Sequence, residues 1–260
     1  MYCKNKEKII EIFKNNVLGK HPDTLKANSK HCGSKGHWLE RAMGIEPNAD
    51  NKADILGYEM KNQTRSKTSF GDWSADWYIF KSRNNKATAF SRDQFLEVFG
   101  KPNEEKEGRV SWSGEPAPKI GKFNRFGQKL VVTESKHIRA IYSYSEDQRE
   151  NKEFIVPIDF QIEDLVLAHW ESSSIKAKLE AKFNQLGWFK CEYDKCKGYF
   201  AIAFGQAINY ETWVALVEQG VVIFDSGMYQ GNSRPYSTWR SNNNFWDSLI
   251  TDRRDFSGEV

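Results

Sequence analysis

The sequence has few cysteines, no long apolar run and almost no net charge, and each shortage excludes a class of protein. Four cysteines in 260 residues are too few for a disulfide scaffold. No apolar run approaches the ~20 residues of a membrane span, and the first residues lack the continuous apolar core of a signal peptide. The 38 Lys and Arg residues against 35 Asp and Glu leave a formal charge of +3, which excludes nucleic-acid binding by bulk charge alone. We therefore expect a cytoplasmic protein.

Apolar and aromatic residues are plentiful by contrast. Hydrophobic residues make up 39% of the chain and aromatic residues 14%, with nine Trp, which is enough for a packed core. Helical spacings alternate with short branched or aromatic runs, so we expect an α/β (α+β) fold with a mixed sheet. Helices are predicted at Ile9–Val17, His37–Met43, Ile175–Leu186 and Glu211–Glu218. Strands are predicted at Ile55–Lys61, Trp77–Lys81, Lys129–Val132, Ile138–Tyr144, Phe154–Ile158, Trp188–Cys191, Tyr199–Phe204 and Val221–Phe224, with an exposed connection at Ser145–Glu153.

The segment from Asp54 to Lys61 (DILGYEMK) concentrates carboxylates and an amine. Side chains alternate along an extended strand, so Glu59 and Lys61 are predicted to point to the same face. Gly57 lets the backbone bend between Asp54 and Glu59, which would bring a second carboxylate beside the first. The segment therefore predicts two carboxylates and one ammonium in a shared site.

Two carboxylates in one site need a proton or a cation between them. Like charges ~4 Å apart repel by roughly 4 kcal/mol at an effective dielectric near 20. Ligation by oxygen alone suits Mg²⁺, which can bridge a phosphate oxygen and polarise an attacking water. Lys61 would orient or deprotonate that water. The spacing alone is equally compatible with a solvated strand edge that carries an incidental ion pair.

The flanking sequence extends the pattern. The stretch Gly33–Glu40 reads GSKGHWLE and is followed by Gly44, and NKAD at 51–54 leads into GYEMK at 57–61. This arrangement resembles the active-site region of the MutH-type branch of the PD-(D/E)XK nucleases. That branch includes a mismatch-repair nicking enzyme and the restriction enzymes MvaI, BcnI and LlaMI. Ala53 stands where the name of the superfamily has proline.

The resemblance implies a catalytic set of Glu40, Asp54, Glu59 and Lys61. The three carboxylates, Glu40 included, would bind Mg²⁺, for which Mn²⁺ can substitute. The implied fold is a mixed sheet flanked by helices, with two lobes that form a DNA cleft. Relatives of MutH also use a further lysine downstream, and the sequence leaves open whether Lys67 or Lys81 has that role.

The implied organisation is a single nuclease domain over residues 1–260. Approximately residues 1–100 would form the catalytic lobe, and approximately residues 101–260 would supply the DNA-recognition elements and the rest of the core.

A basic segment at residues 119–129 is the first candidate for DNA contact. It carries four cations and no acid, and its glycines, with the prolines just before it, argue against a regular helix. A solvated basic loop is the alternative. We expect phosphate or base contacts from Lys119, Lys122, Asn124, Arg125 and Gln128.

A second segment, residues 225–246, is rich in donors, acceptors and aromatic rings but poor in aliphatic side chains. Arg234 and Arg240 have the fork geometry that grips a guanine, a contact worth about 1–3 kcal/mol of discrimination. The segment also resembles the C-terminal recognition region of the same nuclease branch. The DNA contacts that we expect here are those of Arg234, Tyr236, Ser237, Arg240 and Asn242.

Together these patterns predict a type II restriction endonuclease that hydrolyses phosphodiester bonds of double-stranded DNA at a specific short site with Mg²⁺. The alternatives are a MutH-like repair nickase and a non-catalytic, sequence-specific DNA-binding protein. The resemblance further implies a monomer, with a dimer as the alternative, and a cognate DNA methyltransferase in the same restriction-modification system that forms no stable complex with it. We expect no membrane contact.

Overall fold

A computed structural model describes residues 2–23, 34–46, 51–62, 64, 66–81 and 90–260. No helix within these ranges is both long and apolar enough to cross a bilayer. The chain forms two compact units, and it passes from one to the other four times, at no point near residue 100. Unit 1 comprises Met1–Thr68, Lys178–Asn209 and Asn242–Val260, and unit 2 comprises Ser69–Ala177 and Tyr210–Ser241.

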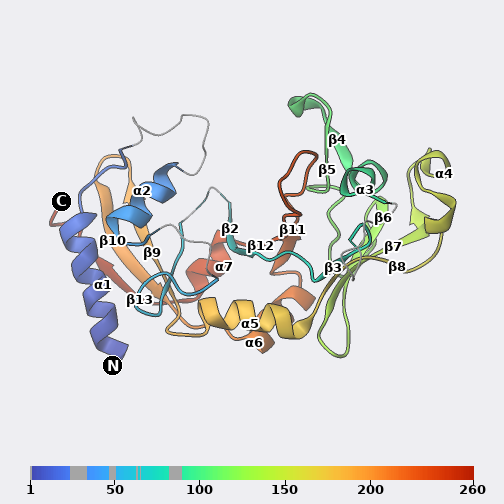
Figure 1. Cartoon of the computed structure of the whole chain (residues 1–260). Helices are drawn as coiled ribbons and strands as arrows, with labels where there is room; N and C mark the ends of the chain where they lie inside the picture. Colours follow the sequence, from blue (N-terminus) through green and yellow to red (C-terminus); the bar gives the residue numbers. More distant parts are fainter. Residues whose placement is uncertain (1, 24–33, 47–50, 63, 65, 82–89) are drawn as a thin grey trace. The chain divides into compact units, whose positions relative to one another are not determined.

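Unit 1 is built on a four-stranded mixed sheet in the order β1-β9-β10-β13, of which Figure 1 labels β9, β10 and β13. The short strand β1 (Glu59–Met60) runs parallel to β9 (Trp188–Asp194). Strand β10 (Gly198–Gly205) is antiparallel to both β9 and β13 (Ile250–Asp255). The parallel pair joins segments that lie far apart in the sequence, and it carries Glu59 into the sheet.

Helices α1 (Tyr2–Asn16) and α2 (Ser34–Ala42) contribute to the core of this unit, and α7 (Asn243–Ser248) lies near its C-terminal end. The predicted first helix is confirmed, and Gly19 follows it with a φ of 70°. The buried core combines one face of α1 with β9 and β10: Ile9, Ile10, Phe13, Val17, Leu39, Met43, Ile45, Tyr58, Met60, Phe189, Cys191, Tyr199, Ile202 and Phe204.

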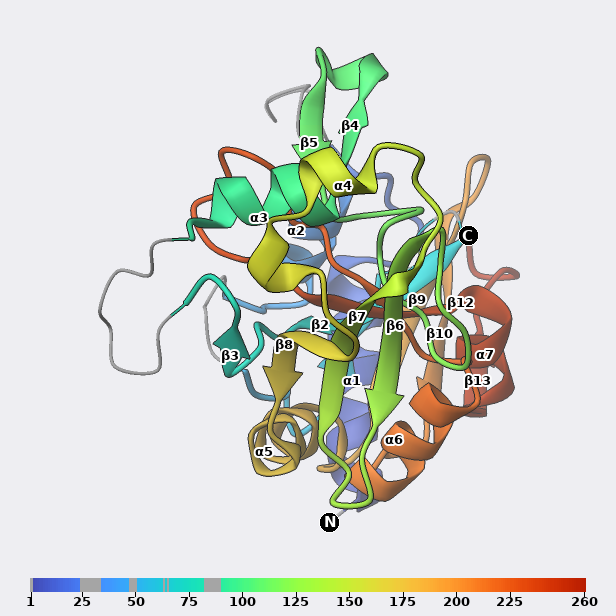
Figure 2. The ribbon, with the colours of Figure 1, turned by 90° about the vertical axis from the view of Figure 1, so that its right-hand side faces the viewer.

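Unit 2 contains an antiparallel sheet in the order β3-β8-β7-β6. Figure 2 shows β6, β7 and β8 side by side. Aromatic packing dominates the interior of the unit, where Trp239 lies 5.5 Å from Trp170, 5.3 Å from Trp213 and 5.2 Å from Phe224 between ring centroids. The strands are β3 (Trp77–Tyr78), β6 (Phe126–Val132), β7 (Ile138–Asp147) and β8 (Leu165–Trp170).

Shorter elements complete the fold. Three elements contain the points where the chain passes between the units: β2 (Lys67–Asp72), α5 (Ser172–Phe183) and β12 (Thr238–Asn242). The remaining elements belong to unit 2: α3 (Arg92–Phe99), β4 (Lys101–Asn103), a 3₁₀ turn (Glu104–Lys106), β5 (Arg109–Ser111), α4 (Lys152–Ile155), a second 3₁₀ turn (Ile158–Phe160), α6 (Tyr210–Glu218) and β11 (Ile223–Asp225).

Two sequence predictions fail between β7 and β8. The strand predicted at Phe154–Ile158 is wrong, because the chain forms α4 and a 3₁₀ turn there and leaves Phe154 85% exposed. Pro157 lacks the N–H that a central strand needs. The connection predicted at Ser145–Glu153 is exposed only in part, because β7 continues to Asp147, whose buried carboxylate accepts hydrogen bonds from Tyr142 and Arg149.

Candidate active site

A tight turn precedes β1 and takes the place of the first half of the predicted strand at Ile55–Lys61. Ile55 and Tyr58 exchange both backbone hydrogen bonds, at 3.0 and 2.8 Å. The two residues between them have positive φ, 50° at Leu56 and 84° at Gly57. Positive φ at both central positions is the geometry of a type I′ hairpin turn, which suits glycine. The bend predicted at Gly57 is therefore present, and the strand begins only at Glu59.

Backbone hydrogen bonds fix the segment that follows the turn. The N–H of Glu59 donates to the carbonyl of Gly187 at 3.1 Å, and the N–H of Lys61 donates to that of Phe189 at 2.8 Å. The N–H of Leu186 donates in return to the carbonyl of Gly57 at 2.9 Å. The positions of Glu59 and Lys61 are thus set by β9 and the residues before it.

The side chains of Glu59 and Lys61 form a buried ion pair. Lys61 Nζ lies 2.7 Å from Glu59 Oε1, and the two side chains are 11% and 3% exposed. The prediction that they share one face is confirmed. A second ammonium, that of Lys182 in α5, lies 3.2 Å from the same oxygen. Glu59 Oε2 is buried and has no hydrogen-bond partner among the described residues, so the carboxylate has one oxygen available to accept a ligand.

Burial changes the acid–base properties of this pair. It raises the pKa of the Glu59 carboxyl, although Lys61 and Lys182 oppose the rise. It lowers the pKa of the Lys61 ammonium, and the neighbouring charge of Lys182 lowers it further. Desolvation disfavours the charged form of each group. The site therefore favours a Lys61 that gives up its proton more readily than an exposed lysine.

The side chain of Asp54 contacts the backbone between Glu59 and Lys61. Its Oδ2 accepts a hydrogen bond from the N–H of Met60 at 2.8 Å, the residue between Glu59 and Lys61. Its charge also raises the pKa of Glu59. Two carboxylates that influence each other in this way form a site that attracts a cation.

Glu40 approaches the same segment from α2. Its Oε1 accepts a hydrogen bond from Asn62 Nδ2 at 3.5 Å, and its Oε2 lies 3.2 Å from His37 Nδ1. The ligand oxygens of Glu40, Asp54 and Glu59 do not all lie within 4.8 Å of one another. The four predicted catalytic residues therefore come from two segments, and their three carboxylates do not form one compact ligand cluster.

The structure places a further lysine beside Glu59, and it is neither Lys67 nor Lys81, the two candidates that the sequence left open. Lys67 and Lys81 are both exposed, whereas Lys182 touches Glu59. The helical spacing over Ile175–Leu186 predicts α5, but nothing in its sequence distinguishes Lys182 from the other lysines of that helix. Its role follows only from the three-dimensional contact.

A cavity of about 10 Å³ adjoins Lys61. This volume is about that of one water-sized probe. Besides Lys61, the lining includes Thr68, Asn243 and Asp247, whose polar side chains could hold a single water near the amine.

Several of the expected DNA-contact residues in the basic segment are exposed, but two have structural roles. Lys119, Lys122 and Arg125 are exposed. Gln128 is fully buried, where it accepts a hydrogen bond from Trp112 Nε1 and donates one to the carbonyl of Phe99. We therefore correct the prediction that Gln128 contacts a base, because both the oxygen and the nitrogen of its amide are hydrogen-bonded inside the protein.

Asn124 organises the loop that carries these cations. Its Nδ2 donates to the carbonyls of Glu115 and Pro116, and its Oδ1 accepts from the backbone of Phe126 and Gln128. These bonds occupy both ends of the amide, so the expected base contact of Asn124 is also corrected.

The second segment presents arginines held by carboxylates. Arg234 Nη2 lies 2.6 Å from Asp72 Oδ2, with 51% of its side chain exposed, and its guanidinium lies over the ring of Tyr236 at 4.5 Å from the centroid. Arg240 Nε lies 3.1 Å from Asp225 Oδ2. Both side chains are oriented before any ligand arrives.

Two other expected contacts in this segment have internal partners. Ser237 is fully buried, and its hydroxyl pairs with that of Tyr78 at 2.7 Å, so the expected DNA contact of Ser237 is corrected. Asn242 is exposed, but its Oδ1 caps α7 by accepting from the N–H of Phe245 at 2.8 Å. Its amide nitrogen is the atom left for a ligand.

Comparisons with known proteins agree on one family. Residues 18–254 match the family described as LlaMI restriction endonuclease. The chain is 49% identical to the type II restriction enzyme ScrFI of Lactococcus lactis subsp. cremoris, over 95% of this chain and 98% of that enzyme. The fold resembles restriction endonuclease MvaI in its complex with cognate DNA substrate, with a TM-score of 0.57 and 12% identity over 98% of both chains. This last likeness shows a shared mixed α/β fold.

Proposed function

The chain belongs to the LlaMI restriction endonuclease family, and from this premise we propose that it hydrolyses phosphodiester bonds of double-stranded DNA at a specific short site with Mg²⁺. It is a type II restriction enzyme and hence a site-specific nuclease. Double-stranded DNA as the substrate is supported by the fold that it shares with a nuclease described in complex with cognate DNA. The observation that carries the catalytic proposal is the buried pair of Glu59 and Lys61, in which one Glu59 oxygen accepts no hydrogen bond from any residue that the structure describes.

Asp54, Glu59 and Glu40 are the residues that would hold the metal ion. The fit rests on the buried Glu59 Oε2, for which the described part of the chain supplies no hydrogen-bond partner, and on a donor set made only of oxygen, which suits Mg²⁺. When bound, the ion supplies Lewis-acid polarisation of a phosphate oxygen and activation of water.

Lys61 is the residue that we expect to move a proton. Its lowered pKa lets Nζ exist as an amine that accepts a proton from the attacking water, as a general base does. Glu59 holds Nζ in place through the 2.7 Å contact. Lys182 offsets the carboxylate charge and opposes the rise that burial causes in the pKa of the Glu59 carboxyl.

Sequence reading is proposed for the exposed side chains of the two recognition segments. Arg234 and Arg240, each already oriented by an aspartate, have the geometry for bidentate contact with guanine. Tyr236 and Asn242 would contact DNA beside them. Lys119, Lys122 and Arg125 would bind phosphates.

We further propose a cytoplasmic enzyme that acts as a monomer, with a cognate methyltransferase in the same system and no stable complex between the two. Sedimentation of the purified protein with and without DNA would test the monomer.

Plasmid cleavage by the variants Glu59→Gln and Lys61→Ala tests the catalytic proposal. We expect both variants to bind target DNA in Ca²⁺ with nearly unchanged affinity and to lose at least about 100-fold in cleavage rate in Mg²⁺, the scale of a lost general base. Lys67→Ala, which removes an exposed lysine of the same unit, is the matched control and should cleave normally.

Three outcomes would count against parts of this proposal. Full cleavage by Lys61→Ala would remove Lys61 from the reaction. Nicking that needs an added partner protein would point to a repair nickase. DNA binding without cleavage by the unaltered enzyme, in Mg²⁺ and in Mn²⁺, would point to a non-catalytic DNA-binding protein.

A further inference from the structure

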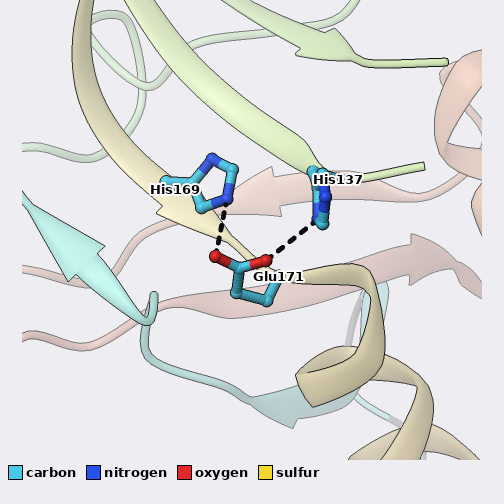
Figure 3. A group of neighbouring side chains, drawn as sticks. All are labelled: His137, His169 and Glu171. Carbon is cyan, nitrogen blue, oxygen red and sulfur yellow. Dashed lines mark ion pairs between the residues drawn. The ribbon is translucent and has the colours of Figure 1, made fainter. Parts of the chain in front are cut away.

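Two histidines and a glutamate converge in unit 2, which contains none of the proposed catalytic residues. The antiparallel register of β7 and β8 explains why they meet. Ile138 pairs with Trp170 and Arg139 with His169, so His137, just before β7, falls opposite Glu171, just after β8. Side chains two apart on one strand share a face, and Figure 3 shows the two rings directed at the carboxylate between them.

The spacing of the three side chains fits a metal ion better than a pair of strong hydrogen bonds. Glu171 Oε1 lies 3.2 Å from His169 Nε2, and Glu171 Oε2 lies 3.3 Å from His137 Nδ1. A charge-assisted N–H···O bond is typically about 2.7–2.9 Å long. Tetrahedral ligands at about 2.0–2.1 Å from Zn²⁺ lie ~3.3 Å apart. One ligand atom from each side chain lies within 4.8 Å of the other two.

The hydrogen bonds of His137 leave an unfavourable contact that a cation would relieve. The backbone N–H of Ser172 donates to His137 Nδ1 at 3.0 Å, so this nitrogen carries no proton. Its lone-pair side nevertheless lies 3.3 Å from Glu171 Oε2, another acceptor. A dication between the two atoms would attract both. The Ser172 N–H would then lose His137 Nδ1 as its acceptor. It lies in the first turn of α5, where backbone N–H groups have no acceptor within the helix and can donate to water instead.

The site opens into a cavity of about 620 Å³ lined by Trp77, His137, Arg139, Val166, His169 and Glu171. The cavity leaves room for water or another ligand in a fourth coordination position. Two imidazole nitrogens and one carboxylate, with a fourth position open, form a donor set found in zinc proteins. A donor set with two nitrogens favours transition metals over Mg²⁺.

Arg139 opposes metal binding in the arrangement observed. Its Nε donates to His169 Nδ1 at 3.1 Å, and a guanidinium does not lose its proton. The proton of a neutral His169 ring is therefore on Nε2, the atom that faces Glu171. Ligation through Nε2 requires that proton to move to Nδ1 and Arg139 to withdraw.

We propose that His137, His169 and Glu171 form a binding site for a transition-metal dication of the Zn²⁺ class, and that Arg139 competes with the ion for His169. The site is separate from the Asp54 and Glu59 carboxylates, which belong to the other unit. A bound ion links the residues at the start of β7, the end of β8 and the start of α5, so it stabilises unit 2 against unfolding.

Metal titration of the full-length chain tests this site. We use the Glu59→Gln background so that the proposed nuclease carboxylate does not contribute, and we measure Zn²⁺ by calorimetry and Co²⁺ by visible absorption. One ion per chain is expected, with the intense visible bands of four- or five-coordinate Co²⁺. Glu171→Gln and His169→Ala should each weaken binding at least about tenfold, since even loss of a ligand's supporting hydrogen bond costs 10–100-fold.

Two further variants complete the design. Arg139→Leu removes the competing cation and should tighten Zn²⁺ binding several-fold. His21→Ala removes a histidine of the other unit, which contacts Tyr193, and should change nothing. Circular dichroism of every variant confirms folding. The proposal is overturned by Co²⁺ bands of octahedral intensity, by binding that survives Glu171→Gln unchanged, or by an Arg139→Leu variant that binds no tighter.

Discussion

At the scale of single residues, Glu59 is the centre of the charge balance in the proposed nuclease site. Its carboxylate lies between the ammoniums of Lys61 and Lys182, and the charge of Asp54 acts on it as well. Two carboxylates and two ammoniums are formally neutral together. A dication and one phosphodiester would add a single positive charge, which either the Glu40 carboxylate or loss of the Lys61 proton would cancel. The neighbouring ammonium of Lys182 lowers the pKa of Lys61, which favours the proton transfer proposed for Lys61.

Replacement of Lys182 tests this balance. Lys182 lowers the pKa of both Glu59 and Lys61, so Lys182→Met should raise both. Cleavage requires both groups deprotonated in our proposal, so the acidic limb of the pH–rate profile should move to higher pH. Single-turnover cleavage measured across pH checks the direction. Lys176→Met, which removes an exposed lysine of the same helix, is the control, and a profile that stays in place or moves to lower pH contradicts the prediction.

The sequence predicted the pairing of Glu59 with Lys61 but not the contact of Lys182. The first depends on strand alternation over two residues, which is a local property. The second depends on which face of α5 turns to β1, and tertiary packing decides that. Tertiary packing also decides the burial of Gln128 and Ser237. Their residue types indicate an interface with DNA, whereas both side chains are buried and hydrogen-bonded inside the protein.

At the scale of elements, the turn between Ile55 and Tyr58 decides where the catalytic strand begins. Gly57 has a φ of 84°, and a Cβ there would lie 3.1 Å from the side chain of Leu186. The turn thus depends on glycine for both backbone conformation and space. Glu59, two residues later, takes its position from this turn and from β9.

Gly57→Ala should lower the free energy of unfolding by roughly 1–2 kcal/mol, the cost of a left-handed backbone for a residue with a Cβ, and should also slow cleavage. Gly44→Ala is the matched control, because Gly44 has a φ of 76° but open space around its Cβ position. Denaturant unfolding and plasmid cleavage separate the two effects. We expect both variants to lose stability and only Gly57→Ala to lose activity, and normal cleavage by Gly57→Ala would contradict the role of the turn.

Most helices and strands could be predicted from periodicity, whereas the cluster of His137, His169 and Glu171 in unit 2 could not. The pairs Ile9 with Phe13 and Ile175 with Leu179 show the helical spacing of α1 and α5 directly in the sequence. His137 and His169 carry no such signal, because the register between β7 and β8 brings them together.

At the scale of the whole molecule, the two units interleave along the chain. Unit 1 takes three separate stretches, so its sheet joins β1 near residue 60 with β9, β10 and β13 from the last third of the chain. Composition and local sequence patterns do not predict such strand pairings, because the paired segments lie far apart in the sequence. For this reason the sequence predicts only an approximate boundary between two lobes, at residue 100.

A fragment of residues 1–100 should therefore fail to fold. It contains Glu40, Asp54, Glu59 and Lys61 but lacks the strands that pair with β1 and complete the core around α1. We expect the circular dichroism of the purified fragment to lack the native signal and its nuclease activity to be absent. A fragment that folds cooperatively would show that the segment is autonomous.

The connectivity of unit 1 also orders events during synthesis. Strand β13 pairs with β10 through residues 250–255, so the sheet that supports β1 is complete only after residue 255 has left the ribosome. Nascent and prematurely terminated chains therefore lack the complete sheet that positions β1 and the proposed catalytic residues, so we expect no cleavage before translation of this segment is finished.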